Sequence, residues 1–368
     1  MKTLNHLYHK IIAFDNLLLA ARKAQKGKRY KPAVSAFHFQ LEENLLQLHH
    51  QLQQKNYQPG GYRTFYVFDP KQRMISAAPY HDRVVHHALC NVIEPIFEKT
   101  FIYDSYANRK GKGTHKAIER YQKYAQQFQY VLKCDIRKFF PSIDHQLLKQ
   151  EIRRKIRCPS TLWLIDRIID NSNPQEAHLQ WFAGDDLFTP LERRSGLPIG
   201  NLTSQFWANV YLNRFDHFIK EELRVPGYIR YVDDFVLFGN DKRQINKWKA
   251  DLTNYLATLR LIPHPHKTQI HQTKDGVPFL GFRVFPQHRY VRKEKVKRYR
   301  RYLKQNLRRK NEGKLSPQTL EDQLNAWLGH IRFGQNQRLE YTIFWYLRRQ
   351  GVRLFRSPSG SWRVLEQQ

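Results

Sequence analysis

The stretch GYIRYVDDFVLFG, which runs from Gly227 to Gly239, decides how the chain can fold. Apolar, mostly β-branched or aromatic residues stand on both sides of two adjacent acids, Asp233 and Asp234, and a glycine closes each end. Short runs of this kind are typical of β-strands, so the stretch predicts a hairpin with the two acids at its tip. Adjacent carboxylates repel one another and need a cation nearby. Mg²⁺ is the expected cation, because it takes oxygen ligands and is commonly shared with the phosphates of a substrate.

A second pair of adjacent acids, Asp185 and Asp186, has a different setting. It follows Gly184 in a stretch that has no flanking strands. In such a setting an Asp pair is expected to form a turn or to cap a helix. We therefore expect a functional role for Asp233 and Asp234 and a structural one for the second pair.

The overall charge predicts an anionic partner. The 368 residues include 63 Lys and Arg against 32 Asp and Glu, which leaves a formal net charge of +31. This excess cannot be neutralised within the chain. Aromatic residues make up 14% of the sequence and favour nucleic acid over a membrane, since aromatic rings stack on bases.

The sequence also limits where the chain is expected to work. No apolar run approaches the roughly 20 residues of a membrane span, and Met1 to Lys10 shows no signal-peptide pattern. The three cysteines, Cys90, Cys134 and Cys158, lack metal-ligand spacing and indicate a reduced compartment without disulfides. We therefore expect a cytoplasmic protein that does not associate with membranes.

A second strand that ends in an acid precedes the hairpin. Tyr130 to Asp135 is an apolar run that ends in a carboxylate and leads into Phe139 and Phe140. A lone acid at a strand end is usually a cap. If this strand lies next to the hairpin in an antiparallel sheet, however, Asp135 would stand beside Asp233 and complete an oxygen set for two Mg²⁺ ions.

Three further segments of the sequence have recognisable patterns. Two strand-like runs flank the turn Asp69–Gln72 and present Lys71 and Arg73. The glycine-punctuated segment Ser195–Gln205 is either a loop whose backbone approaches a ligand or a plain turn, and a helix from Phe206 to Leu223 is expected to follow it. Phe279 to Val284 predicts one short strand.

The region after residue 290 is strongly basic. Residues 291–310 hold 11 Lys and Arg against one Glu, with apolar residues at helical intervals. A charge run is normally a solvated helix face. At this density, a track for phosphate groups explains the pattern better.

In this order, the motifs resemble those of reverse transcriptases. The resemblance covers roughly residues 61–285, with Tyr231–Asp234 (YVDD) as the acid hairpin and Cys134–Phe140 (CDIRKFF) as the other catalytic strand. It implies an α+β, right-hand polymerase fold. Its parts would be an N-terminal helical extension (residues 1–60), fingers and palm with an antiparallel sheet (61–285) and a basic helical thumb (286–368).

The resemblance also implies roles for individual residues. Asp135, Asp233 and Asp234 would be catalytic and, with the backbone carbonyl of Ile136, would bind two Mg²⁺ ions. Phe140 would exclude a ribose 2′-hydroxyl, and an isoleucine at 199, where most relatives have glutamine, would relax fidelity. The residues expected to bind the incoming nucleotide are Lys71, Arg73, Phe140, Ile199, Gly200 and Lys267. The residues expected to form the primer grip are Phe279, Leu280 and Gly281.

The glycine loop suggests a subgroup. The string LPIGNLTSQ, Leu197 to Gln205, is similar to that of reverse transcriptases from diversity-generating retroelements. This similarity implies a template-repeat RNA copied with errors at adenines, dNTPs as substrates, a cDNA–RNA duplex as product and a small basic pentameric accessory protein as partner. A bacterial or phage origin would follow. Because the stretch after residue 285 is short, we expect no RNase H, maturase or endonuclease domain of ordinary size.

Two alternatives remain open at this stage. Within enzymes, the chain can instead be a group II intron-like or retron-like reverse transcriptase. In a different class, it can be a non-catalytic RNA-binding scaffold on a polymerase fold. The scaffold interpretation would predict a broken acid set, whereas Asp135, Asp233 and Asp234 are all present.

Overall fold

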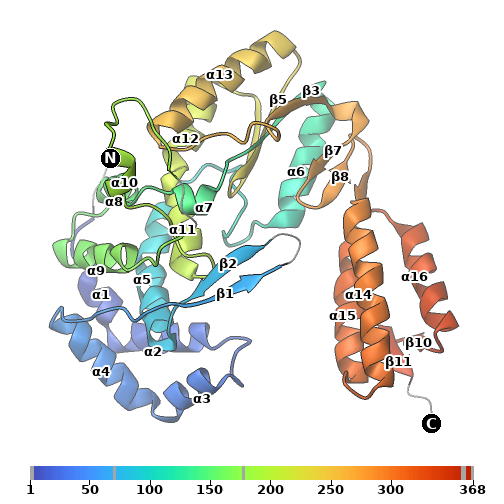
Figure 1. Cartoon of the computed structure of the whole chain (residues 1–368), viewed down its shortest axis with the longest axis horizontal. Coiled ribbons are helices and arrows are strands. Elements are labelled where there is room, and N and C mark those ends of the chain that lie inside the picture. The colour runs from blue at the N-terminus through green and yellow to red at the C-terminus, as the bar shows by residue number, and fades with distance from the viewer. Residues whose placement is uncertain (1–3, 69–71, 176–178, 358–361, 366–368) are drawn as a thin grey trace. The chain divides into compact units, whose positions relative to one another are not determined.

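The computed structural model describes residues 4–68, 72–175, 179–357 and 362–365, and these form two compact units (Figure 1). The first unit comprises Met1–Gly111, Lys133–Val236 and Arg243–Gln269, and the second comprises Lys112–Leu132, Leu237–Lys242 and Ile270–Gln368. The chain mixes helices with antiparallel strand pairs, as predicted for an α+β fold.

The first unit is mainly helical. Its helices are α1 (Tyr8–Ile12), α2 (Phe14–Ala24), α3 (Pro32–Phe39), α4 (Leu41–Gln53), α5 (Tyr80–Glu98), α7 (Phe139–Ser142), α8 (His145–Arg153), α9 (Pro159–Asp170), α10 (Thr189–Glu192), α11 (Leu202–Tyr211), α12 (Asn213–His217), a π-helical turn (Phe218–Glu222) and α13 (Lys242–Thr258). Its antiparallel hairpin consists of β1 (Arg63–Val67) and β2 (Arg73–Ala77).

Helix α5 forms the centre of the first unit's helical layer. Its apolar face is fully buried at Val84, Val85 and Leu89, and α2 and α11 pack against it. The segment before β1 is tied to the same helix, because the Tyr57 hydroxyl and the Gly60 N–H both donate to the buried Asp82 carboxylate, at 2.5 and 2.9 Å. The N-terminal helices therefore share a core with α5.

A four-stranded sheet carries the acids singled out in the sequence. Its order is β4-β5-β3-β6, with β4 (Gly227–Tyr231), β5 (Asp234–Gly239), β3 (Tyr130–Asp135) and β6 (Gln269–Gln272). The predicted hairpin is confirmed, since β4 and β5 are neighbours. The strand that ends at Asp135 lies next to β5, which is the adjacency on which a combined acid site depends.

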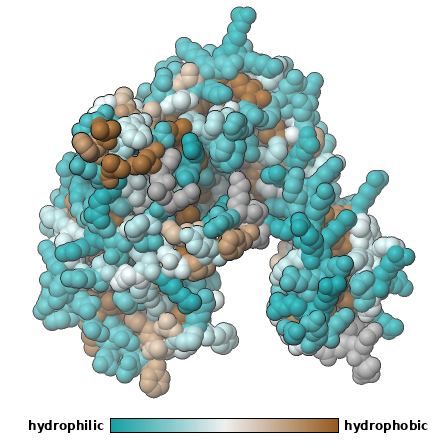
Figure 2. Space-filling view, viewed as in Figure 1, coloured by the Kyte–Doolittle hydropathy of each residue, from teal (hydrophilic) through white to brown (hydrophobic). Residues whose placement is uncertain are grey.

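The second unit is built from α6 (Thr114–Gln127), a three-stranded antiparallel sheet and a helical bundle. The sheet strands are β7 (Val277–Phe279), β8 (Phe282–Val284) and β9 (Arg289–Val291), preceded by a 3₁₀ turn (Thr273–Asp275). The bundle contains α14 (Lys293–Asn311), α15 (Pro317–Phe333) and α16 (Gln337–Arg349), followed by the pair β10 (Arg353–Arg356) and β11 (Trp362–Leu365). Hydrophilic residues cover most of the bundle face shown in Figure 2.

Two sequence predictions about elements are wrong. The single strand expected from Phe279 to Val284 is a two-residue hairpin, because Leu280 and Gly281 both have positive φ (45° and 89°) and turn the chain between β7 and β8. The helix expected from Phe206 to Leu223 begins at Leu202 and is divided into α11, α12 and the π-helical turn.

Two other expectations are confirmed. Asp186 caps a turn, since its Oδ1 accepts hydrogen bonds from the backbone N–H groups of Phe188 and Thr189 at 2.9 and 2.7 Å. The three cysteines are free and buried. Among the described helices, none has the length and apolar character needed to cross a bilayer.

Candidate active site

The tip of the β4–β5 hairpin has a strained backbone. Val232, which stands directly before the two acids, has a φ of 60°. This left-handed conformation is a genuine outlier for a β-branched residue and costs of order 1–3 kcal/mol. Strain of this kind persists only where surrounding contacts stabilise it. Here the backbone conformation of Val232 orients the two acids that follow it, Asp233 and Asp234.

A buried polar network beneath the tip supplies those contacts. The Arg230 guanidinium forms a bidentate ion pair with Asp216 of α12, at 2.7 and 2.6 Å, and both side chains have no solvent exposure. The same guanidinium donates to the Asn209 side chain at 3.1 Å and to the Val232 carbonyl at 3.2 Å. The Tyr228 hydroxyl donates to Asp216 at 2.7 Å. The strained turn is thus fastened to the helices below the sheet.

Asp135 meets a lysine at the end of β3. The Lys267 ammonium lies 2.6 Å from Oδ2 of Asp135, and the Asp135 side chain is 15% exposed. The segment that carries Lys267 is held in place by main-chain bonds, since the His264 N–H donates to the Asp135 carbonyl at 2.7 Å and the Arg137 N–H donates to the Ile262 carbonyl at 2.9 Å. The lysine is therefore positioned by the same strand that positions the acid.

The three acids influence one another. Burial, together with the Asp234 and Asp135 carboxylates, raises the pKa of Asp233 to about 7, while Lys267 opposes the rise. Burial also raises the pKa of Asp234, and a hydrogen bond with the Asp135 carboxyl adds to that rise. Negative charge is thus crowded in this corner, as expected where like charges share a site.

The donor chemistry of this corner fits a divalent cation. Three carboxylates meet here, opposed by the ammonium groups of Lys267 and Lys133, which leaves an excess of negative charge that a hard cation with oxygen ligands can balance. Among the residues that the structure describes, no three His, Cys, Asp or Glu side chains already surround one point as ligands. Asp135, Asp233 and Asp234 are the residues that can hold such an ion.

A cavity of about 520 Å³ brings two of the predicted nucleotide-binding residues together. Arg73 from β2 and Ile199 from the glycine loop both line it, together with Pro141, which follows Phe140. The Arg73 side chain is exposed and Ile199 is half-buried. A cation and an apolar side chain therefore face one space, which suits a phosphate-bearing ligand with a flat ring.

The glycine loop is fixed by main-chain bonds on two sides. The Ile199 carbonyl accepts from the Ser76 N–H of β2 at 2.9 Å, and the Leu197 N–H donates to the Phe140 carbonyl at 2.9 Å. Gly200 has a φ of 118°, and a Cβ there would lie 3.1 Å from Ile75. The positive φ favours glycine, and a Cβ would press on Ile75, so the loop fits closely against β2.

The remaining predicted residues have other settings. Lys71 lies outside the described residues. Phe279, Leu280 and Gly281 belong to the second unit, where Phe279 is buried and stacks on Tyr121 with ring centroids 5.0 Å apart. Their role in holding a primer stays a prediction.

Sequence reasoning missed Arg230 and its partner Asp216. A signal was available, because Arg230 is the one charged residue in the apolar run from Gly227 to Val232. A charge in a strand that is buried on both faces needs a buried counter-charge. The sequence alone does not single out which acid supplies it.

The chain belongs to the reverse transcriptase (RNA-dependent DNA polymerase) family, whose model matches residues 68–284. Among curated proteins, it is 25% identical over 278 residues to protein YkfC of Escherichia coli K12, which covers 65% of this chain and 68% of YkfC. It is 24% identical over 181 residues to the group II intron-encoded protein LtrA of Lactococcus lactis subsp. cremoris, which covers 48% of this chain and 28% of LtrA.

Among solved structures, the chain is similar to a truncated apo telomerase from Candida tropicalis, with a TM-score of 0.45 and 13% identity over 63% of this chain and 55% of that one. The family match and the mixture of helices with antiparallel sheets confirm the predicted polymerase fold class.

Proposed function

We propose that this chain is an RNA-directed DNA polymerase whose nucleotidyl transfer takes place at Asp135, Asp233 and Asp234. One observation carries the proposal: β3 and β5 are neighbours in one sheet, which brings Asp135 close enough to hydrogen-bond the Asp234 carboxyl and to act on Asp233, 98 residues further along the chain. The membership of the chain in the reverse transcriptase family supports the same conclusion.

The three acids, with the backbone carbonyl of Ile136, would hold two Mg²⁺ ions. Bound ions of this kind lower the pKa of a primer 3′-hydroxyl and offset the charge of the departing pyrophosphate. The chain's own contribution is to keep the acids close together. The Arg230 guanidinium does this by fixing the carbonyl of the strained Val232.

Cationic side chains would hold the triphosphate. Arg73 is exposed at the cavity that Ile199 also lines. Lys71, two positions earlier in the sequence, is included on the resemblance alone. Lys267 is paired with Asp135, and its ammonium would be the cation nearest the acids for a substrate phosphate to contact. Phe140 would face the sugar and exclude a 2′-hydroxyl, which selects dNTPs. The boundaries at residues 60 and 285 between extension, catalytic core and thumb are part of this proposal.

Primer extension tests the proposal. The full chain, supplied with an RNA template, a paired DNA primer, dNTPs and Mg²⁺, should extend the primer, and Asp233→Ala should abolish extension. Asp15→Asn is the matched control, because Asp15 is an exposed acid of α2 in the N-terminal helices. If RNA binds but no primer is extended, even with the native RNA and any accessory protein present, the scaffold interpretation replaces this one.

The loop sequence supports a more specific proposal, that the enzyme serves a diversity-generating retroelement. Ile199 faces the cavity with an apolar side chain, so it offers no hydrogen bond near a nascent base pair. The template would be a repeat RNA, and a basic barrel-shaped accessory protein would be the partner. A neighbouring pair of DNA repeats that differ mainly at adenines would support this subtype.

A second candidate is an intron-type reverse transcriptase. The similarity to the group II intron-encoded protein LtrA favours it, although the chain spans only 28% of that protein. Under this alternative, the flanking DNA encodes a folded intron RNA and lacks the adenine-variable repeats. Sequencing the flanking DNA therefore distinguishes the two candidates without any enzyme assay.

A further inference from the structure

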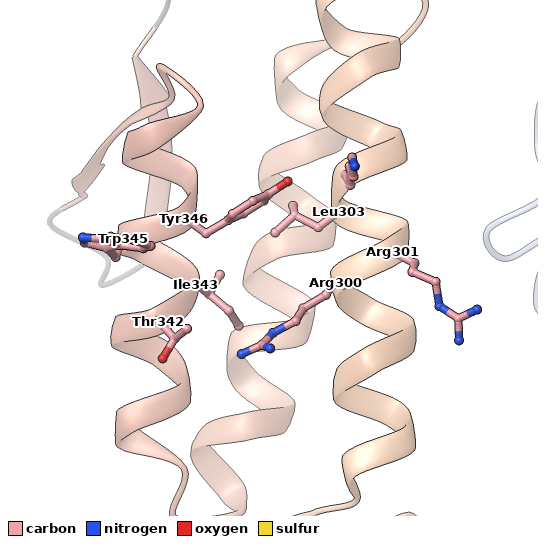
Figure 3. Close-up of a pocket in the computed structure, with 8 residues that line it drawn as sticks. Arg300, Arg301, Leu303, Thr342, Ile343, Trp345 and Tyr346 are labelled. Atoms are coloured by element: carbon pink, nitrogen blue, oxygen red, sulfur yellow. The ribbon is translucent and has the colours of Figure 1, made fainter.

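The helical bundle of the second unit contains a pocket of about 410 Å³ between α14 and α16 (Figure 3). Its lining includes Arg300, Leu303 and Lys304 of α14 and Ile343 and Tyr346 of α16. The pocket lies entirely within the second unit. It contains none of the acids or nucleotide-binding residues discussed above.

The inner part of the pocket is apolar. Leu303 and Ile343 are both 3% exposed and form its floor. The ring of Tyr346 extends from α16 toward Leu303 of α14, so an aromatic face borders the space between the helices (Figure 3). A slot with an aliphatic floor and an aromatic wall suits a flat ring, which removes apolar surface from water on both faces.

The mouth of the pocket is cationic. Arg300 and Lys304 are four residues apart and therefore lie on one face of α14, and both are exposed. Among the described residues, neither has an acidic partner within ion-pair distance. The acid in the first turn of α14, Glu294, pairs with Arg292 instead. These cations attract an anion that the described part of the chain does not provide.

The pocket combines an apolar slot for a flat ring with the exposed cations Arg300 and Lys304, and this combination matches one class of ligand. An unpaired nucleotide offers a base for stacking and a phosphate for the cations. A duplex offers phosphates but keeps its bases stacked inside, so it cannot fill the slot. An anionic peptide would satisfy the cations, while its backbone polar groups would be unsatisfied against Leu303 and Ile343. The basic accessory protein proposed above is disfavoured here by like charge.

We propose that the pocket between α14 and α16 binds an unpaired nucleotide of single-stranded nucleic acid. The base stacks against Tyr346, and the phosphate contacts Arg300 and Lys304. This site is separate from the polymerase centre and does not require catalysis. The shared chemistry of RNA and DNA strands fits the pocket, and the experiment below compares them.

Photocrosslinking locates the binding site. The probes are a 12-nucleotide RNA with one central 4-thiouridine, the matching DNA with 4-thiothymidine, and each strand paired with its complement. With the full chain, the single strands should crosslink to the peptide that contains Tyr346, and the duplexes should not. Equal crosslinking by single strands and duplexes, or crosslinks only outside α14 and α16, would overturn the proposal. The single strand that crosslinks with the higher yield, RNA or DNA, identifies which nucleic acid the pocket prefers.

Affinity measurements test the role of the ring. By fluorescence anisotropy, Tyr346→Ala should weaken single-strand binding about tenfold, and Tyr346→Phe should restore it because the stacking face is kept. Tyr341→Ala is the matched control: Tyr341 lies on the same helix, is 74% exposed and does not line the pocket. Equal losses for Tyr346→Ala and Tyr341→Ala would contradict the assignment. So would displacement of the probe from the pocket by an acidic peptide but not by unlabelled single strands.

These outcomes are independent of the polymerase proposal. Primer extension measured on the same preparations reports the acid centre, whereas the crosslinks report α14 and α16. A chain that extends primers without crosslinking at Tyr346 refutes only the pocket. A chain that crosslinks there without extending primers refutes only the enzyme.

Discussion

The Arg230 guanidinium and the Asp216 carboxylate form a bidentate ion pair, at 2.7 and 2.6 Å, with both side chains fully buried. The pair connects β4, which leads into the turn at Asp233 and Asp234, to α12. Because Arg230 also donates to the carbonyl of Val232, the pair links the position of the turn to the helical layer. A contact that looks purely structural therefore determines where Asp233 and Asp234 stand.

Replacing Arg230 should damage both stability and activity. Arg230→Met leaves Asp216 charged and buried with the Tyr228 hydroxyl as a partner but no counter-charge, so we expect a loss of about 3–5 kcal/mol in the free energy of unfolding. Arg230→Lys keeps the charge but cannot make all of the guanidinium's bonds at once. It should retain more stability than the Met variant and still lower the extension rate at a temperature where the chain is folded. Urea denaturation and single-turnover extension check this, and a Lys variant with unchanged rate would argue against control of the turn by Arg230.

Ile199→Gln should raise fidelity. A glutamine at this position in the cavity can hydrogen-bond near the nascent pair, and one such bond is worth about 0.5–1.5 kcal/mol, or a several-fold gain in discrimination. Sequencing of cDNA copied from a defined RNA should show fewer errors opposite adenine. Ile199→Leu is the control and should keep the parental error spectrum. Identical spectra for the Gln variant and the parent would remove Ile199 from the fidelity argument.

Phe140→Ala should admit ribonucleotides. Phe140 is half-buried, and its ring contacts Phe139 edge-on with centroids 5.5 Å apart. Removing the ring deletes the proposed steric barrier, so the ratio of kcat/KM for dNTP over NTP should fall by roughly 10–100-fold. Phe139→Ala serves as the contrast, since Phe139 is a core residue and its loss should cost about 3–5 kcal/mol of stability. If Phe139→Ala alters sugar selection and Phe140→Ala does not, the assignment of the two rings is reversed.

Acid should destabilise the first unit through His86. This side chain is fully buried in α5, and burial lowers its pKa from 6.5 to about 4, with Arg83, His81 and His87 adding to the effect and Asp82 opposing it. The contribution of His86 to the free energy of unfolding is therefore fully present above pH 6.5. This contribution decreases as the pH drops from 6.5 toward 4, because His86 binds a proton in the unfolded chain and stays neutral in the folded one. The loss from this group amounts to about 3 kcal/mol.

Comparison with the variant His86→Gln isolates the contribution of His86 to the pH dependence of stability. The free energy of unfolding of His86→Gln should fall less steeply between pH 6.5 and 4.5 than that of the parent, even if the variant is less stable at pH 8. Urea titrations at several pH values measure both slopes. Parallel curves for the two proteins would show that His86 does not carry this pH dependence.

Local patterns predicted the parts of the fold that depend on neighbouring residues. The hairpin around Asp233 and Asp234 and the strand that ends at Asp135 are confirmed, because short apolar runs and their closing turn residues are local signals. The turn at Leu280 was missed because a leucine with positive φ is rare, and only the pairing of Phe279 with Phe282 imposes it.

Contacts between distant segments could not be predicted from the sequence. Nothing local indicates that Asp216 would neutralise Arg230, or that Lys267 would reach Asp135 across 132 residues of chain. The pocket at Tyr346 likewise arises from the packing of two helices. Residue type and spacing identified which side chains carry chemistry, and the tertiary structure identifies which partners hold them.

The most direct test of the central claim is a double-mutant comparison of Asp135 and Asp233 in single-turnover primer extension. If the two acids serve one metal-dependent centre, Asp135→Asn and Asp233→Asn should each reduce the rate by at least about 100-fold, and the double variant should be scarcely slower than either single variant. Independent, multiplying losses, or full activity in Asp135→Asn, would contradict a shared centre.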